Sequence, residues 1–175
     1  VKENEPDIYA HIQKFMLSGD YIAYKLSGNI NTTISGLSEG VFWDFKSNSI
    51  AHWLLEHYGI EENLIPEIVG TFSVQAKVSK KGASESGLAE GTPILYRAGD
   101  QPNNALSLNV FHPGEVAATG GTSGVIYAIS ESLSVKESAR VNNFAHVNYT
   151  TQNTRIGKMA CINGAGIMYR WLMNN

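Results

Sequence analysis

The amino-acid sequence predicts an α/β fold in which helices fill the first third of the chain and strands become frequent after residue 70. Apolar residues recur at near-helical spacing in the first third, whereas polar and apolar residues alternate from Val74 to Val78, which is typical of a half-buried strand. Apolar residues make up 43% of the 175 residues and can form a buried core. We therefore expect a folded chain rather than a disordered one.

The first predicted elements are two helices and a loop. Asp7 can cap a helix that reaches Met16, and a second helix runs from Asp20 to the glycine stop signal at Gly28. Residues 29–40 are rich in Asn, Thr, Ser and Gly, and this composition predicts a loop or a short helical turn.

A second group of elements follows before residue 70. An extended segment is expected over residues 41–45. Ser47 can cap a helix over residues 48–58, which Gly59 ends, and a single helical turn is expected over residues 61–64.

Strands dominate the remainder of the chain. Residues 74–78 and 92–98 are expected to be strands, with a turn over 80–82, and residues 103–110 are expected to be helical. The last elements are strands over 116–119 and 125–129, joined as a hairpin by 120–124, and a helix over 163–172.

Charge and composition exclude several classes of function. Thirteen Lys and Arg against sixteen Asp and Glu give a net charge of −3, without a basic stretch, so we expect neither a nucleic-acid partner nor a membrane partner. The single cysteine, Cys161, excludes an intrachain disulfide and a cysteine-cluster zinc site, and is expected to be a small buried apolar side chain. The five histidines lack metal-ligand spacing, so no metal site is predicted and surface or packing roles are expected.

The two ends of the sequence resemble cuts. The chain lacks an initiator Met and a signal peptide, and it closes inside a predicted helix. We therefore expect a window of a longer protein that crosses a domain boundary, with one domain ending near residue 104 and the next starting at residue 105.

One candidate site is the segment from Ala98 to Gln101. Asp100 follows the end of a predicted buried strand, where ligands collect in open α/β sheets. A carboxylate there can accept the proton of an alcohol, and Gln101 can hydrogen-bond a polyol. The commoner alternative is that Asp100 caps the following helix.

A second candidate is the glycine-rich segment from Gly120 to Gly124, which includes Thr122 and Ser123. Its backbone N–H groups and two hydroxyls can hold phosphate oxygens, although no Lys follows as in a Walker A loop. The commoner alternative is a plain hairpin turn. Gly164 and Gly166 also open a helix, whose N-terminus favours anions, but these glycines can equally mark close packing.

These segments together resemble the FGGY family of carbohydrate kinases. The resemblance rests on Gly19-Asp20-Tyr21-Ile22-Ala23-Tyr24-Lys25-Leu26-Ser27-Gly28, Ala98-Gly99-Asp100-Gln101, Gly120-Gly121-Thr122-Ser123-Gly124 and Gly164-Ala165-Gly166, in that order. It covers nearly the whole chain. The opening residues and the Gly-Thr-Ser-Gly turn are most similar to the xylulokinase branch of the family.

The resemblance implies a fragment of a two-domain, actin-like (ribonuclease H-like) sugar kinase. Residues 1–104 would end the first, sugar-binding domain, and residues 105–175 would begin the second, nucleotide-binding domain. Asp100 matches the family's general base and Gln101 a sugar-contacting position. The residues matched to ATP-phosphate binding are Gly121, Thr122, Ser123 and Gly166.

The resemblance also implies ATP-dependent phosphorylation of a sugar hydroxyl, with Mg²⁺, in the cytoplasm. D-xylulose is the expected sugar, in pentose catabolism, and gluconate, rhamnulose, fuculose and glycerol are alternatives. The family allows a homodimer. We expect the isolated 175-residue piece to be inactive, because the first phosphate loop and the adenosine motif lie outside it. Two other interpretations stay open: a non-catalytic actin-like binding module and a purely structural fragment.

Overall fold

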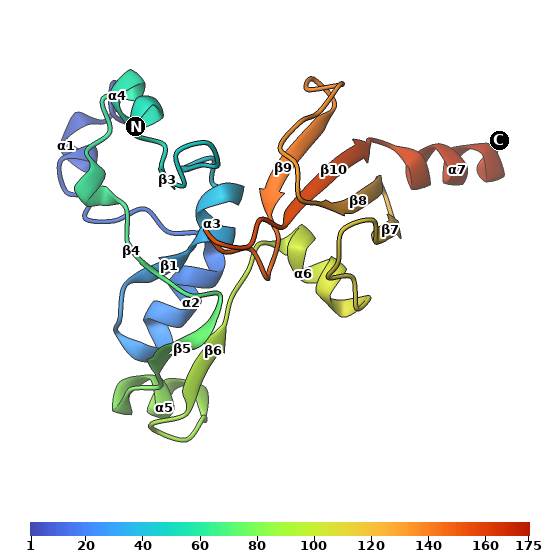
Figure 1. The fold of residues 1–175 in the computed structure, drawn as a ribbon. Helices are drawn as coiled ribbons and strands as arrows, with labels where there is room; N and C mark the ends of the chain where they lie inside the picture. Colours follow the sequence, from blue (N-terminus) through green and yellow to red (C-terminus); the bar gives the residue numbers. More distant parts are fainter. The chain divides into compact units, whose positions relative to one another are not determined.

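The structure is a computed structural model that describes residues 1–175, and the chain forms two compact units. Unit 1 comprises Val1–Arg97 and unit 2 comprises Ala98–Asn175 (Figure 1). Both mix helices with strands, as the sequence predicts. None of the helices is both long and apolar enough to cross a membrane.

Unit 1 contains short helices and three strand pairs. Its helices are α1 (Pro6–Tyr9), α2 (Ser18–Ser27), α3 (Ile34–Glu39), α4 (His52–Tyr58), the 3-10 turn Glu62–Leu64 and α5 (Lys80–Ser86). Its strands are β1 (Asn31–Thr33), β2 (Trp43–Asp44), β3 (Ser49–Ile50), β4 (Glu67–Val69), β5 (Phe72–Lys77) and β6 (Pro93–Tyr96). β1 pairs with β4 in parallel, whereas β2 with β3 and β5 with β6 are antiparallel.

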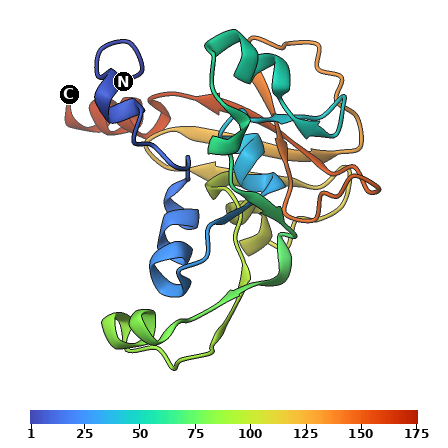
Figure 2. The same cartoon turned by 90° about the vertical axis from the view of Figure 1, so that its left-hand side faces the viewer.

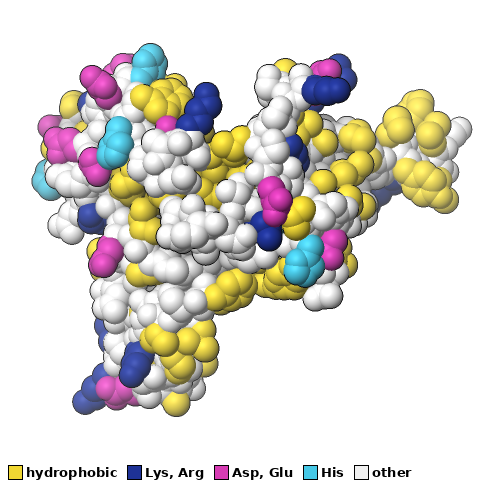
Figure 3. All heavy atoms as spheres, viewed as in Figure 1, with side chains coloured by type: hydrophobic (Ala, Val, Ile, Leu, Met, Phe, Trp, Pro, Cys, Tyr) yellow, Lys and Arg dark blue, Asp and Glu magenta, His cyan; other side chains and the backbone are white.

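Unit 2 is a four-stranded antiparallel sheet with two helices. Its elements are α6 (Asp100–Ser107), β7 (Val116–Gly120), β8 (Gly124–Ser130), β9 (Val141–Ala145), β10 (Ile156–Ile162) and α7 (Ala165–Asn174). The strand order in the sheet is β7-β8-β10-β9. Helix α6 packs on the sheet through a core of Ala105, Val110, Ala117, Tyr127 and Ile129. Helix α7 leaves the end of β10 with its apolar side chains exposed (Figure 3).

The first predicted helix is much shorter than expected. Only Pro6–Tyr9 is helical, and Glu5 rather than Asp7 precedes it. The chain then extends, because the Phe15 N–H bonds to the Leu64 carbonyl at 2.8 Å and the Phe15 ring stacks on Phe42. These contacts override the helical pattern of the segment.

The helix predicted behind Ser47 also begins later. Ser47 donates to Asp44 in the β2–β3 turn, at 2.9 Å, and so does not cap a helix. Helix α4 starts at His52 and ends at Tyr58, and the following Gly59 has a φ of 59°, the left-handed conformation expected of a glycine stop.

The turn predicted over residues 80–82 is wrong. These residues begin helix α5, and the Ser79 hydroxyl accepts the Gly82 N–H at 3.0 Å as its cap. Gly82 is needed there because a Cβ would overlap the backbone of Leu26 at the end of α2. Helix α5 therefore lies against the end of α2 (Figure 2).

Helix α6 begins three residues earlier than predicted, at Asp100. Strands β1, β3, β4, β9 and β10 were not predicted. The first three have only two or three residues each and β9 is rich in polar residues, whereas β10 has seven mainly apolar residues, so its composition allowed the assignment. The helix ending at Gly28, the β7–β8 hairpin and the helix behind Gly164 are confirmed.

Candidate functional site

The glycine-rich segment forms the tip of the β7–β8 hairpin. Gly120 pairs with Gly124, and the Gly121 N–H bonds to the Ser123 carbonyl at 3.0 Å. Gly121 and Thr122 are exposed and Ser123 is half-buried. The tip therefore presents a hydroxyl and backbone groups to solvent, as a phosphate-binding turn requires.

The start of helix α7 meets this hairpin tip. The Gly166 N–H donates to the Thr122 carbonyl at 3.0 Å. A Cβ on Gly166 would overlap the Gly121 carbonyl oxygen, so only glycine permits this approach. Gly164, with φ of 82°, is the N-cap of α7.

The structure thus brings together all four residues predicted to bind ATP phosphate, Gly121, Thr122, Ser123 and Gly166. The backbone N–H of Gly166 is engaged by the turn, so this glycine acts by close packing rather than by donating to an anion. The helix dipole of α7 nevertheless points its positive end towards the hairpin tip, where it favours negative charge.

Asp100 and Gln101 lie at the start of another element, helix α6. Gly99 is buried and extended and forms the N-cap, and the Asn103 N–H bonds to its carbonyl at 3.1 Å. Asp100 is the first helical residue, with an exposed side chain that makes no capping bond. The structure therefore contradicts the alternative in which Asp100 caps the helix. The Gln101 Nε2 lies 3.5 Å from Asp100 Oδ2.

A buried ionic network precedes Asp100 in the chain, and the sequence analysis did not find it. Arg97 Nε lies 3.3 Å from Asp20 Oδ1, and their side chains are only 9% and 7% exposed. The Thr32 hydroxyl donates to Asp20 Oδ2 at 2.8 Å. Arg97 also donates to the Asn31 carbonyl at 3.2 Å, and so links the end of β6 to α2 and β1.

Burial governs the charge state of this network. It raises the pKa of the Asp20 carboxyl above its usual value, while the Thr32 hydroxyl, the Arg97 guanidinium and the Leu17 backbone N–H lower it. Burial likewise lowers the pKa of Arg97, and the Asp20 charge opposes that effect. Each charge therefore depends on the other for its stability inside unit 1.

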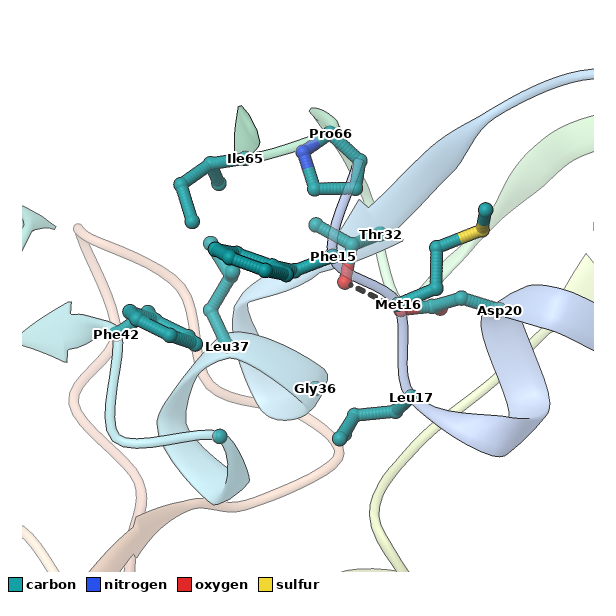
Figure 4. Close-up of a pocket in the computed structure, with 11 residues that line it drawn as sticks. Phe15, Met16, Leu17, Asp20, Thr32, Gly36, Leu37, Phe42, Ile65 and Pro66 are labelled. Carbon is teal, nitrogen blue, oxygen red and sulfur yellow. Dashed lines mark hydrogen bonds between the residues drawn. The ribbon is translucent and has the colours of Figure 1, made fainter. Parts of the chain in front are cut away.

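A small pocket of about 40 Å³ adjoins Asp20 and Thr32 (Figure 4). Its other lining residues are mainly apolar and include Phe15, Leu37 and Ile65. Sites for small-molecule ligands usually have volumes of about 300 Å³ or more. This pocket has room for water at most, so it is a packing feature beside the network and not a sugar site.

Two further expectations concern Cys161 and metals. Cys161 is exposed rather than buried, because it lies at the end of β10, where its thiol donates to Asn163 Oδ1 at 3.4 Å. No group of three or more His, Cys, Asp or Glu side chains gathers in the chain.

Comparisons with known proteins agree with the fold. The profile of the N-terminal domain of the FGGY family of carbohydrate kinases matches residues 1–107. The chain therefore belongs to the FGGY family of carbohydrate kinases. That family has the actin-like ATPase fold, and the mixed helix and strand structure of this chain matches it.

Individual relatives carry several kinase names. The chain is 27% identical over 146 residues to a xylulose kinase of Staphylococcus xylosus, which covers 83% of this chain and 30% of that protein. It is 33% identical over 119 residues to an autoinducer-2 kinase of Enterobacter sp. (strain 638), which covers 68% of this chain and 22% of that protein. The chain thus spans less than a third of the length of these relatives.

Solved structures superimpose on nearly all of the chain. A "xyloylose kinase" from Brucella ovis gives a TM-score of 0.85 at 26% identity, over 98% of this chain and 34% of that one. A glycerol kinase from Plasmodium falciparum with ADP gives 0.84 at 19% identity, over 99% of this chain and 35% of that one, and this shows a shared fold.

Proposed function

We propose that this chain supplies the central part of an ATP-dependent sugar kinase. The observation that carries the proposal is the packing of Gly166 against the Gly121–Ser123 turn, which joins a glycine-rich hairpin tip to the positive end of a helix. A plain hairpin turn needs no such close approach. The exposed Asp100 carboxylate at the start of α6 provides the second component, a proton acceptor.

In the proposed reaction, a sugar hydroxyl oxygen forms a bond to the γ-phosphorus of ATP. The bond from that phosphorus to the β–γ bridging oxygen breaks, which yields a sugar phosphate and ADP. Asp100 accepts the hydroxyl proton, because an alcohol is a poor nucleophile. Gln101 hydrogen-bonds the sugar, and the Thr122 hydroxyl with the adjacent backbone stabilises the transferring phosphoryl group.

Mg²⁺ would neutralise charge on the nucleotide phosphates. It is commonly held by one or two carboxylates together with substrate phosphates, and this chain gathers no metal cluster. We therefore assign no metal ligand among these residues. The boundary between the sugar and nucleotide domains near residue 104 stays a prediction, as do the cytoplasmic location and the homodimer.

D-xylulose is the proposed substrate, since a xylulose kinase is among the relatives and a "xyloylose kinase" is among the solved structures. The autoinducer-2 kinases, at up to 33% identity, make the autoinducer-2 class the principal competitor. A coupled ADP-release assay on the intact protein, with Mg-ATP and a panel of these sugars, gluconate and glycerol, tests the assignment. Turnover of D-xylulose above all others is the expected result.

The role of Asp100 is tested by Asp100→Asn in the same protein. We expect kcat to fall by about 10²-fold or more with a small change in KM for ATP, because the proton acceptor is lost and the phosphate turn is intact. Asp7→Asn, at an exposed position in α1, is the matched control and should leave kcat unchanged. Near-normal turnover of Asp100→Asn would remove this residue from the mechanism.

A further inference from the structure

Unit 2 contains a fully buried histidine that the proposed reaction does not use. His146 follows strand β9 and is 0% exposed. Its Nε2 lies 3.0 Å from the Val110 carbonyl oxygen, and its Nδ1 lies 3.3 Å from the Tyr127 hydroxyl. Because a carbonyl only accepts, Nε2 must carry the proton. Nδ1 is then free to accept from Tyr127, so one neutral tautomer satisfies both bonds.

The Val110 carbonyl belongs to the turn that ends helix α6. The Val110 N–H bonds to the Ala105 carbonyl at 3.0 Å, and the Asn109 N–H bonds to the Leu106 carbonyl at 2.9 Å. Asn109 has a left-handed φ of 58°. This pattern is a Schellman motif, in which Val110 also packs against Ala105 in the core. His146 therefore holds the end of α6 by a hydrogen bond in addition to apolar contact.

Tyr127 is itself held in one position. It is 2% exposed, and its ring lies 5.7 Å from the His146 ring. A Cβ on Gly157, in the neighbouring strand β10, would overlap the Tyr127 ring. The absence of that Cβ gives the ring its place on the sheet. The sequence of contacts from β10 through Tyr127 and His146 to Val110 thus joins the sheet to α6.

The other end of α6 begins with Asp100. The helix has eight residues, Asp100–Ser107, and so is about 12 Å long. A rotation of about 5° about its anchored end would move its first residue by about 1 Å. A misplacement of that size is sufficient to lower a rate by about 10²-fold.

We propose that His146 is a positioning residue, which fixes the orientation of α6 and thereby of the Asp100 carboxylate through its hydrogen bond to the Val110 carbonyl. The inference rests on the proposed role of Asp100 as proton acceptor. It assigns His146 no contact with sugar or nucleotide.

The test uses His146→Leu, His146→Gln and Tyr127→Phe in the intact protein. His146→Leu removes both hydrogen bonds, and we expect kcat to fall at least about tenfold while KM for ATP changes less than about twofold. The amide of Gln can still donate to the Val110 carbonyl, so His146→Gln should recover most of kcat. Tyr127→Phe removes one hydroxyl and should lower kcat by at most about fivefold.

Hydrogen exchange of the α6 amides supplies a readout that is independent of turnover. It should accelerate in His146→Leu and not in the control His112→Leu, an exposed histidine two residues beyond Val110. The positioning role would be overturned if His146→Leu kept the wild-type kcat. It would also be overturned if His146→Leu and His146→Gln lost kcat equally. If the wild-type protein turns over no sugar, the proposed function fails, whereas unchanged α6 exchange would show that the anchor itself is wrong.

Discussion

The two units bury polar side chains of different kinds. Unit 1 buries a charged pair, in which Asp20 and Arg97 lie 3.3 Å apart with less than a tenth of either side chain exposed. Unit 2 buries His146 with Tyr127, and burial lowers the pKa of His146 to about 4, so this pair is neutral at pH 7. Both join elements that are distant in the sequence.

The difference lies in what remains when one partner is removed. An orphaned buried charge has lost its solvation as well as its partner, whereas an orphaned neutral donor or acceptor has lost a single hydrogen bond. The ionic network should therefore be far more sensitive to a single substitution than the histidine–tyrosine pair. The two should also respond to pH with opposite sign.

The largest expected effect is that of Arg97→Met. It leaves the Asp20 carboxylate buried without a cation, and we expect a loss of about 4 kcal/mol in the free energy of unfolding, measured by urea denaturation of the intact protein. The double variant Asp20→Asn with Arg97→Met should recover most of it. Lys81→Met, at an exposed lysine, is the control. A loss below about 1 kcal/mol would mean that the pair is not buried in solution.

Acid pH should separate the two regions. His146 has its folded pKa, about 4, below the unfolded value of about 6.5, so the unfolded chain binds the additional proton. The stability that neutral His146 contributes is fully present above pH 6.5. As pH falls towards 4, the free energy of unfolding decreases by about 3 kcal/mol in total.

The pKa of Asp20 is raised in the folded state, so the folded chain binds the additional proton at this residue. The stability that protonated Asp20 contributes is therefore lost as pH rises through its folded pKa. The stability profiles of wild type, His146→Gln and Asp20→Asn from pH 3.5 to 7.5 measure both effects. His146→Gln should flatten the decline between pH 6.5 and 4. An unchanged decline in that variant would assign the acid sensitivity to other groups.

Close packing gives the next effect. Gly157→Ala would force its Cβ into the Tyr127 ring, and we expect a loss of about 2 kcal/mol. Gly19→Ala, in α2 of unit 1, is the contrasting case, because a Cβ there meets no atom within 4 Å. It should be neutral or slightly stabilising. Thermal unfolding compares the two variants, and equal effects would show that the Tyr127 ring readily yields.

Local signals in the sequence predicted the elements that depend on local chemistry. Gly28 and Gly59 end helices in left-handed conformations, and the glycine-rich segment forms the β7–β8 hairpin. The approach of Gly166 to this hairpin follows from its lack of a Cβ. The family resemblance gave Gly166 a place near the nucleotide phosphates, and that role stays a prediction. The assignment of Asp100 as base is not tested by the structure and stays a prediction.

The remaining features depend on contacts between distant residues. The segment after Tyr9 has helical spacing but is extended, because Phe15 bonds to Leu64 and stacks on Phe42. Nothing near Arg97 in the sequence indicates that it pairs with Asp20. Periodicity indicates which residues are apolar, but it does not predict which distant residue a side chain contacts.

The smallest effect concerns the cap of helix α5 in unit 1, compared with the starts of the two helices of unit 2. In unit 1, the Ser79 hydroxyl accepts the Gly82 N–H at 3.0 Å and donates to the Leu26 carbonyl at 3.1 Å, so it caps α5 and ties it to α2. In unit 2, α6 and α7 begin behind Gly99 and Gly164, which offer no capping side chain. Helices α1, α2 and α4 of unit 1 likewise begin without a side-chain cap, so the Ser79 cap is a local feature of α5.

Ser79→Ala should therefore lower the free energy of unfolding by about 1 kcal/mol without changing kcat, because it removes a structural cap remote from the proposed chemistry. Lys81→Ala, which removes only the exposed pair with Glu85 at 3.8 Å, should cost about 0.3 kcal/mol. Urea denaturation and the ADP-release assay on the same preparations separate the two quantities. A fall in kcat for Ser79→Ala in fully folded protein would connect α5 to catalysis, and it would contradict a purely structural role of the Ser79 cap.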